Sequence, residues 1–141
     1  MKKILAKSIG ITLKKHSQDV SKTSLMILNK VSKSPTSDDV EIVRIGSALH
    51  DIGKCTSEFQ KMLNFEIKNT KNKFRHNEIG WAFLYKYLNV DDTILYHILD
   101  IVYWHHGISN QLSKFNYLDI LNTIENDDIQ IMKNELVSIL G

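Results

Sequence analysis

Apolar residues recur at helical spacing along this chain, and no run of residues alternates apolar and polar side chains as a half-buried β-strand does. Pro35 is the only proline. The sequence therefore predicts an all-α fold, with one domain covering residues 1–141. The first helix is expected at about residues 11–32, and its buried face should carry Leu13, His16, Val20, Ser24, Ile27, Leu28 and Val31.

A second helix is predicted after the break at Pro35. Asp38 followed by Glu41 resembles a capping box at its start. This helix runs to Leu49 and delivers His50 and Asp51 at its end. Gly53 then either ends the helix or permits a close backbone approach.

The remaining chain is expected to form five more helices. A short helix passes through Phe59 and Leu63, and a polar loop at residues 66–73 precedes a helix at about residues 75–89, which places His76 near a helix start. Asp91 or Asp92 caps a helix that leads to Trp104, with Gly107 just past its C-terminus. Two shorter helices are expected at residues 117–124 and 129–140, with an acidic turn at residues 125–128 between them.

Histidines and one aspartate gather at the expected helix ends. His50 and Asp51 follow one helix, His76 opens another, and His105 and His106 close a third. Neighbours on a regular helix point about 100° apart, so adjacent residues share a site more easily at a terminus. Imidazole nitrogens and a carboxylate suit divalent transition metals, and Asp51 is the natural bridge between two ions.

A pair of metal ions favours hydrolysis of phosphate esters, because two ions can activate water and clamp the attacking and leaving oxygens of a phosphodiester. Lys54 follows Asp51 closely and has two interpretations. It either neutralises phosphate charge or is a surface lysine near a helix C-terminus.

Charge is distributed unevenly along the chain. Residues 1–75 carry 15 Lys and Arg against 7 Asp and Glu, whereas residues 76–141 carry 3 against 9. The basic residues around the expected loop indicate a site for a polyanion such as nucleic acid, or simply a solvated loop. They are Lys61, Lys68, Lys71, Lys73 and Arg75.

The single cysteine, Cys55, excludes an intrachain disulfide. We find neither an export signal nor a membrane span, and expect a cytoplasmic protein with no membrane partner.

Residues 48–54, Ala-Leu-His-Asp-Ile-Gly-Lys, with Phe59-Gln60 shortly after, resemble the signature of the HD-domain phosphohydrolase superfamily. Residues 74–77 (Phe-Arg-His-Asn) and 104–107 (Trp-His-His-Gly) extend the likeness. In order and spacing they are similar to the HD nuclease domain of the type I CRISPR-associated helicase-nuclease. The resemblance covers about residues 12–107, because it assigns His16 to the upstream histidine of that family.

This resemblance implies a compact helical bundle with its metal site between helices, and cleavage of single-stranded DNA by metal-activated water. The implied cofactor is one or two divalent ions, namely Mn²⁺, Ni²⁺, Co²⁺ or Fe²⁺, with Mg²⁺ as a further candidate. Asp51 and Lys54 would be the catalytic residues. The implied partner is a separate helicase or a CRISPR effector complex, since no helicase motif is present here. The implied metal ligands are His16, His50, Asp51, His76, His105 and His106.

Two alternatives remain open from the sequence. One is a phosphohydrolase of nucleotides or cyclic nucleotides, against which Phe59-Gln60 and the tandem His105-His106 argue. The other is a truncated non-catalytic module, a split subunit or decoy, that binds DNA or an effector complex. It is motivated by the 34 residues that follow Gly107, since family members normally continue to a helix with a last metal-binding aspartate. Asp119 is the candidate for that residue.

Overall fold

The structure, a computed structural model, describes residues 2–106 and 116–141, and it confirms the all-α prediction. The described residues contain no β-strand, only one isolated bridge between Leu5 and Thr12. Gly107 and its expected place after a helix lie outside these residues. In order, the helices are α1 (Leu13–Val31), α2 (Ser37–Leu49), the 3₁₀ helix η1 (Ile52–Cys55), α3 (Ser57–Leu63), α4 (His76–Tyr87), α5 (Asp92–Trp104), α6 (Tyr117–Leu121) and α7 (Asn126–Leu140).

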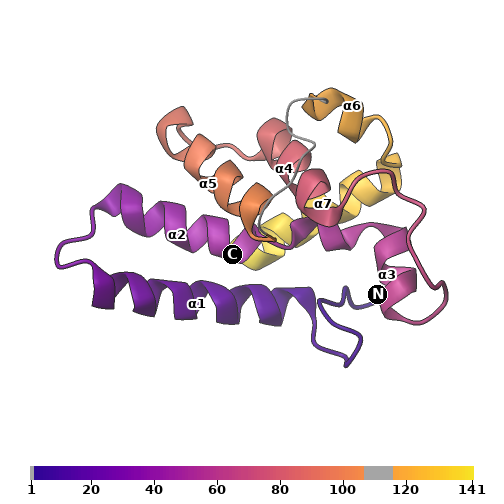
Figure 1. Ribbon diagram of the computed structural model, residues 1–141, viewed down its shortest axis with the longest axis horizontal. Coiled ribbons are helices and arrows are strands. Elements are labelled where there is room, and N and C mark those ends of the chain that lie inside the picture. Colours follow the sequence, from indigo (N-terminus) through magenta and orange to yellow (C-terminus); the bar gives the residue numbers. More distant parts are fainter. Residues whose placement is uncertain (1, 107–115) are drawn as a thin grey trace.

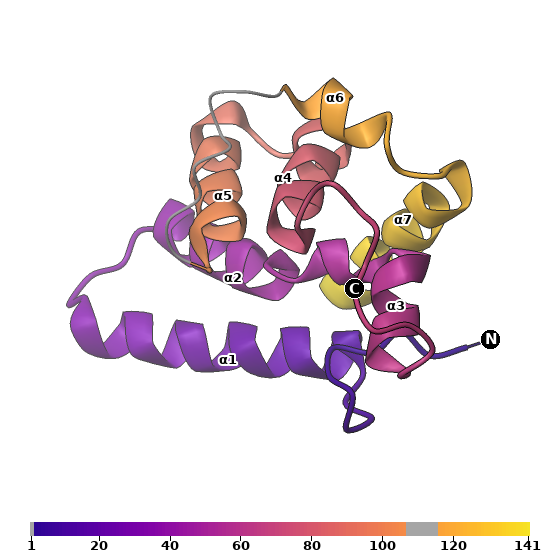
Figure 2. The same cartoon turned by 45° about the vertical axis from the view of Figure 1, so that its right-hand side comes forward.

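The helices are stacked on both sides of α2. α1 runs along one side of α2 as an antiparallel hairpin, and α5 packs on the other side (Figures 1 and 2). α4 lies between α5 and α6 and rests on η1, and α7 closes the bundle against η1. The ends of α2 and α5 and the start of α4 thus come together near η1. Fully buried side chains from these elements form the core: Leu13, Leu49, Ile52, Phe83, Ile98, Val102 and Met132.

The buried face of α1 differs from the prediction at its C-terminal end. Ile27 and Val31 are 55% and 77% exposed, so their expected burial is wrong. The buried residues along the helix include the small Ser17 and Ser21, and the hydroxyl of Ser21 donates to the carbonyl of Arg44 on α2 at 3.0 Å. Small side chains at these positions let the two helices approach closely.

The start of α2 also differs from the prediction. Thr36, not Asp38, is the N-cap: its hydroxyl accepts from the amide of Asp39 at 3.1 Å, and the Asp39 carboxylate accepts from the amide of Thr36 at 2.9 Å. Glu41 instead accepts two hydrogen bonds from the guanidinium of Arg44. Thr36 is in the extended conformation that an N-cap requires, and this decides the register.

The acidic stretch before α7 belongs mostly to the helix, so the expected turn at residues 125–128 is wrong. Glu125 is the N-cap, while Asp127 and Asp128 occupy the first turn. Carboxylates there are favoured by the helix dipole. Asp128 also accepts from the amide and the hydroxyl of Ser57, at 3.1 and 3.2 Å, which joins α7 to α3.

None of the helices in the described part of the chain combines the length and the apolar character needed to cross a lipid bilayer.

Candidate metal centre

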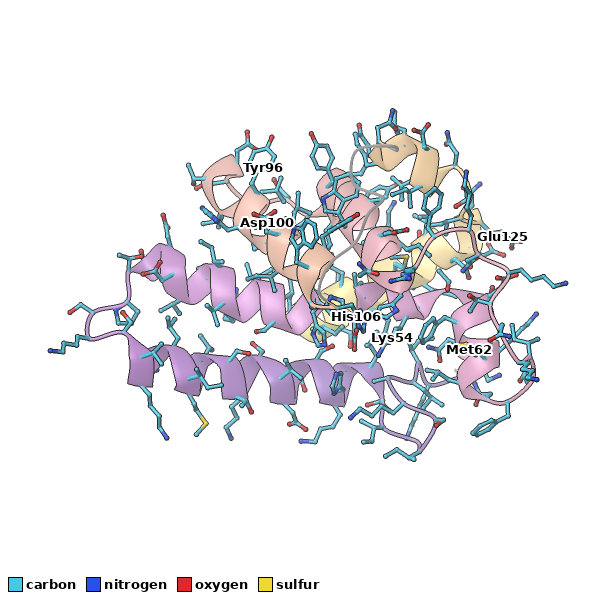
Figure 3. All side chains as sticks on the ribbon, viewed as in Figure 1. Lys54, Met62, Tyr96, Asp100, His106 and Glu125 are labelled. Atoms are coloured by element: carbon cyan, nitrogen blue, oxygen red, sulfur yellow. The ribbon has the colours of Figure 1, made fainter. Side chains whose placement is uncertain are left out.

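The predicted site residues come together where several helices begin or end. His50 is the C-cap of α2, Asp51 follows it, and His76 is the first residue of α4. His105 is the C-cap of α5, with His106 next to it. His16 reaches the same place from the side of α1, and Lys54 from η1. Figure 3 shows Lys54 and His106 at the centre of the molecule, where α2 and α5 end.

Asp51 lies at the centre of this cluster, and its two carboxylate oxygens have different neighbours. Oδ1 lies 3.3 Å from Nε2 of both His76 and His105. Oδ2 lies 3.3 Å from Nε2 of His16 and 3.2 Å from Nε2 of His50. The carboxylate is almost fully buried. Each oxygen of Asp51 therefore faces a separate set of imidazoles.

These sets form two candidate ligand groups that share Asp51. The first group is Asp51, His76, His105 and His106, and the second is His16, His50 and Asp51. Within each group the ligand atoms lie within 4.8 Å of one another. One carboxylate that belongs to two groups has the arrangement of a bridging ligand.

Backbone carbonyls orient two of the imidazoles. Nδ1 of His50 donates to the carbonyl of Ser47 at 2.6 Å, and Nδ1 of His105 donates to the carbonyl of Val102 at 2.6 Å. Because a carbonyl only accepts, the proton of each neutral ring is on Nδ1, and Nε2 presents a lone pair. Outer-shell hydrogen bonds of this kind fix metal-ligating histidines. Each carbonyl belongs to the last turn of the same helix, so the helix end itself sets the ring direction.

The donor atoms fit a divalent cation. Bonds of about 2.0–2.2 Å to imidazole nitrogen and carboxylate oxygen place neighbouring ligands about 3.0–3.4 Å apart, and the contacts to Asp51 have this spacing. Nε2 of His105 is buried and has no hydrogen-bond partner among the described residues. A lone pair facing a carboxylate oxygen is repulsive unless a proton or a metal ion lies between them. The other ring nitrogen of His105, Nδ1, already carries the proton of the neutral ring and donates it to the carbonyl of Val102. This favours a metal ion between Nε2 and the carboxylate oxygen.

Electrostatics keep Asp51 ionised. Burial opposes its charge, but contacts with His105, His50 and His76 outweigh burial and hold the pKa of Asp51 far below its usual range. Burial lowers the pKa of His16 and of His76. Burial, with the neighbouring charges of His105 and His76, lowers the pKa of His106 to about 4. These three imidazoles are thus held neutral at neutral pH, the state in which they bind metal ions.

The pKa of His50 is shifted in the opposite direction. Burial disfavours its charged form, but the hydrogen bond and charge of Asp51 prevail and raise the pKa of His50. His106 completes the first group through a contact of 2.7 Å between its Nε2 and Nε2 of His76.

Lys54 is part of the site and not a surface residue, so the second interpretation of Lys54 is wrong. Its side chain is 15% exposed, and Nζ lies 2.8 Å from Oδ2 of Asp51. The same ammonium donates to the carbonyl of Ala6 at 3.4 Å. Lys54 thus places a positive charge beside the second ligand group.

Asp119 does not join the cluster. It lies in the first turn of α6, where its carboxylate accepts from the amide of Asn116 at 3.1 Å. Within the described residues, Asp51 is the only carboxylate in the two ligand groups.

Three further residues position the site. Gly53 permits a close backbone approach to His76, one of the two roles considered for it. Asn77, beside His76, donates to the carbonyl of Tyr103 at 2.8 Å and ties the start of α4 to the end of α5. Gln60 binds the N-terminal segment to η1. Asn77 and Gln60 both belong to the motifs that carry the family resemblance, but the sequence analysis assigned neither of them a role.

The chain was compared with models of known protein families. The family model described as "Cas3, HD domain" matches residues 6–139. This range extends beyond residues 12–107 in both directions and includes all members of the two ligand groups. Neither a search of curated proteins nor a search of solved structures found a match.

Proposed function

Because the chain belongs to the family of Cas3 HD domains, we propose that it is a metal-dependent nuclease that cleaves single-stranded DNA in CRISPR interference. The family supports the coarser function of an HD-type nuclease or phosphohydrolase. The observation that carries the proposal is the Asp51 carboxylate, each oxygen of which faces its own set of imidazoles.

Both ligand groups have a role in this proposal. His16, His50 and Asp51 would hold one ion, and Asp51, His76, His105 and His106 the other. Bound Mn²⁺, Ni²⁺, Co²⁺, Fe²⁺ or Mg²⁺ would supply Lewis acidity at a phosphodiester and acidify a water molecule.

The chain's own residues prepare this chemistry. Asp51 stays ionised and offers one oxygen to each group. The carbonyls of Ser47 and Val102 fix the rings of His50 and His105, so that little reorganisation accompanies binding. Lys54, 2.8 Å from Asp51, can turn its ammonium toward a phosphate oxygen and stabilise negative charge there.

The preference for a polyanionic strand rests on charge. Lys61, Lys68, Lys71, Lys73 and Arg75 lie on α3 and on the segment between α3 and α4, which leads to His76. Such a basic surface raises the local concentration of nucleic acid. A separate helicase or CRISPR effector complex would supply the strand, and the expected location is the cytoplasm.

The test is cleavage of circular single-stranded DNA by the purified chain with Mn²⁺, Ni²⁺, Co²⁺ or Mg²⁺ added in turn. We expect metal-dependent cutting, and its loss in Asp51→Ala and in Asp51→Asn. Asp119→Ala is the matched control, because it removes a carboxylate outside the cluster and should leave cutting intact. Circular dichroism of each variant separates loss of chemistry from loss of fold.

Two other results would overturn the proposal. Turnover of mononucleotides or cyclic nucleotides without action on DNA would identify a small-molecule phosphohydrolase. No cutting with any metal, together with tight binding to an effector complex or helicase, would identify a non-catalytic module. The second alternative gains weight from the structure, because Asp119 supplies no further carboxylate to the site.

A further inference from the structure

A cleft of about 320 Å³ adjoins the first ligand group. It lies between η1, α3, the segment of residues 70–75 and the start of α4. His76 and His106, both members of the ligand group, form part of its wall, so a molecule in the cleft touches the metal centre directly. Its other wall residues include Phe59, Thr70, Asn72 and Arg75.

Phe59 connects the cleft to the reacting centre. Its half-buried ring lies 5.2 Å from the ring of His76 in an edge-to-face arrangement, and Nζ of Lys54 lies 5.9 Å from its centroid. Phe59 thus stands between one metal-ligating histidine and the lysine that faces Asp51. An aromatic ring in this place can stack on a nucleobase, a contact that single-strand binding proteins use for all four bases.

The rim of the cleft is polar and basic. Thr70 and Asn72 offer hydrogen-bonding groups, and Arg75 is exposed beside them. Within the described residues no hydrogen bond or ion pair engages the guanidinium of Arg75. The segment itself is anchored, because the amide of Lys71 donates to the carboxylate of Glu58 on α3 at 2.9 Å. A guanidinium held at such a rim matches the geometry of a phosphate.

We propose that this cleft is the subsite for one nucleotide next to the scissile phosphate, with its base against Phe59 and its distal phosphate against Arg75. The inference rests on the proposed nuclease function and specifies the substrate: an unpaired strand whose bases are free to stack. The volume lies at the lower end of the range for ligand sites, which suits a single nucleotide unit. Paired bases within a duplex could not present a face to Phe59.

The test is equilibrium binding of two labelled oligonucleotides to the full chain in EDTA, measured by fluorescence anisotropy. One oligonucleotide is oligothymidine, and the other has the same backbone with abasic sites throughout. Both carry the same charge, so the phosphate contribution cancels in their comparison. We expect the wild-type chain to prefer oligothymidine, and Phe59→Leu to weaken its binding about 5- to 100-fold while hardly changing the binding of the abasic strand.

Two control variants, Phe65→Leu and Lys68→Gln, are available on the stretch of chain between α3 and α4. Phe65→Leu removes an aromatic ring that is 81% exposed and lies outside the cleft, and it should change neither affinity. Arg75→Gln should weaken the binding of both oligonucleotides more than Lys68→Gln does, although Lys68→Gln removes the same charge from a position outside the cleft.

If Phe59→Leu weakens both oligonucleotides equally, or if Phe65→Leu has the same effect as Phe59→Leu, the subsite is wrong. This outcome is separable from failure of the nuclease function, because the binding measurement needs no cleavage. If the chain cuts DNA but Phe59→Leu affects both oligonucleotides alike, the nuclease function stands and the subsite is wrong. If Phe59→Leu weakens only the binding of oligothymidine but no metal supports cutting, the subsite stands and the nuclease function is wrong.

Discussion

Gly53 and His76 are in contact through their backbones: a Cβ placed on Gly53 would lie 1.8 Å from the carbonyl oxygen of His76. The same Cβ would lie 3.0 Å from the amide nitrogen of Gly80, one turn further along α4. The first turn of α4 therefore rests directly on η1, and only glycine allows it. This contact sets the position of His76 relative to Asp51, two residues before Gly53.

We expect Gly53→Ala to destabilise the fold by about 2–3 kcal/mol and to weaken metal binding, because the clash is with backbone atoms that cannot rotate away. Urea unfolding and calorimetric titration with Mn²⁺ measure the two effects. Gly46→Ala is the control: its Cβ would meet the end of the Ile101 side chain at 2.7 Å, which can shift. The control should be less destabilised and keep wild-type metal affinity. Unchanged Mn²⁺ affinity in Gly53→Ala would contradict this role.

Gln60 holds the N-terminal segment beside Lys54. Its side chain accepts from the amide of Leu5 at 2.8 Å, and donates to the carbonyls of Leu5 at 2.9 Å and Lys54 at 2.7 Å. Gln60→Leu leaves these backbone groups unpaired, for which we expect a loss of about 2–3 kcal/mol. Trypsin should then cut faster at the exposed Lys7. Gln130→Leu, on the exposed face of α7, should change stability by less than about 0.5 kcal/mol and leave the trypsin rate unaltered.

The position of the cluster at helix ends could be predicted from the sequence, because the pairs His50-Asp51 and His105-His106 both follow apolar helical repeats. Two adjacent side chains point into one site more easily where a helix ends, and the structure places both pairs at helix ends. The periodicity also located His16 on the covered face of α1. These predictions succeeded because they depend on local geometry alone.

Other features depend on contacts between distant segments. The hydrogen bonds between Gln60 and Leu5 join residues 55 positions apart, and the sequence around either residue does not predict them. The exposure of Val31 depends on which part of α1 is covered by α2, and the sequence of α1 alone does not show this. The N-cap at Thr36 was missed for a different reason, since Asp38 and Glu41 offered a competing local pattern, and the extended backbone after Pro35 decided between them.

Glu135 on α7 gives a pH-dependent contribution to stability. Burial raises its pKa, against the attraction of Lys14. A carboxyl group whose pKa is raised by folding binds its proton more tightly in the native state, so its contribution is most favourable below the unfolded value and declines as the pH rises through the raised value. We therefore expect Glu135→Gln to be slightly more stable than the wild type at pH 7, by less than about 1 kcal/mol because the group is only partly buried.

This advantage of Glu135→Gln should shrink as the pH falls toward 4, which thermal unfolding across that range would show. Asp100→Asn removes the same charge from the exposed face of α5 and should shift stability by less than about 0.5 kcal/mol. A stabilisation of Glu135→Gln that is constant with pH would mean that the ionised carboxylate is not the cause.

The two ligand groups predict that the chain binds two divalent ions and that single substitutions separate them. His16 belongs to one group only and His105 to the other, so His16→Ala and His105→Ala should each reduce the bound Mn²⁺ or Co²⁺ from two ions to one. Asp51→Ala should lose both, since each group uses one of its oxygens. His97→Ala removes an exposed histidine of α5 and should retain two ions. Elemental analysis after dialysis gives the stoichiometry.

Thermal unfolding supplies an independent reading of the same prediction. An ion at 100 times its dissociation constant adds about 2.7 kcal/mol to stability at each site, so the wild type should gain about twice as much from saturating Mn²⁺ as either histidine variant. If His16→Ala and His105→Ala each abolish all binding, the imidazoles form one site. Asp51 would then be a ligand to a single ion that all of these histidines share.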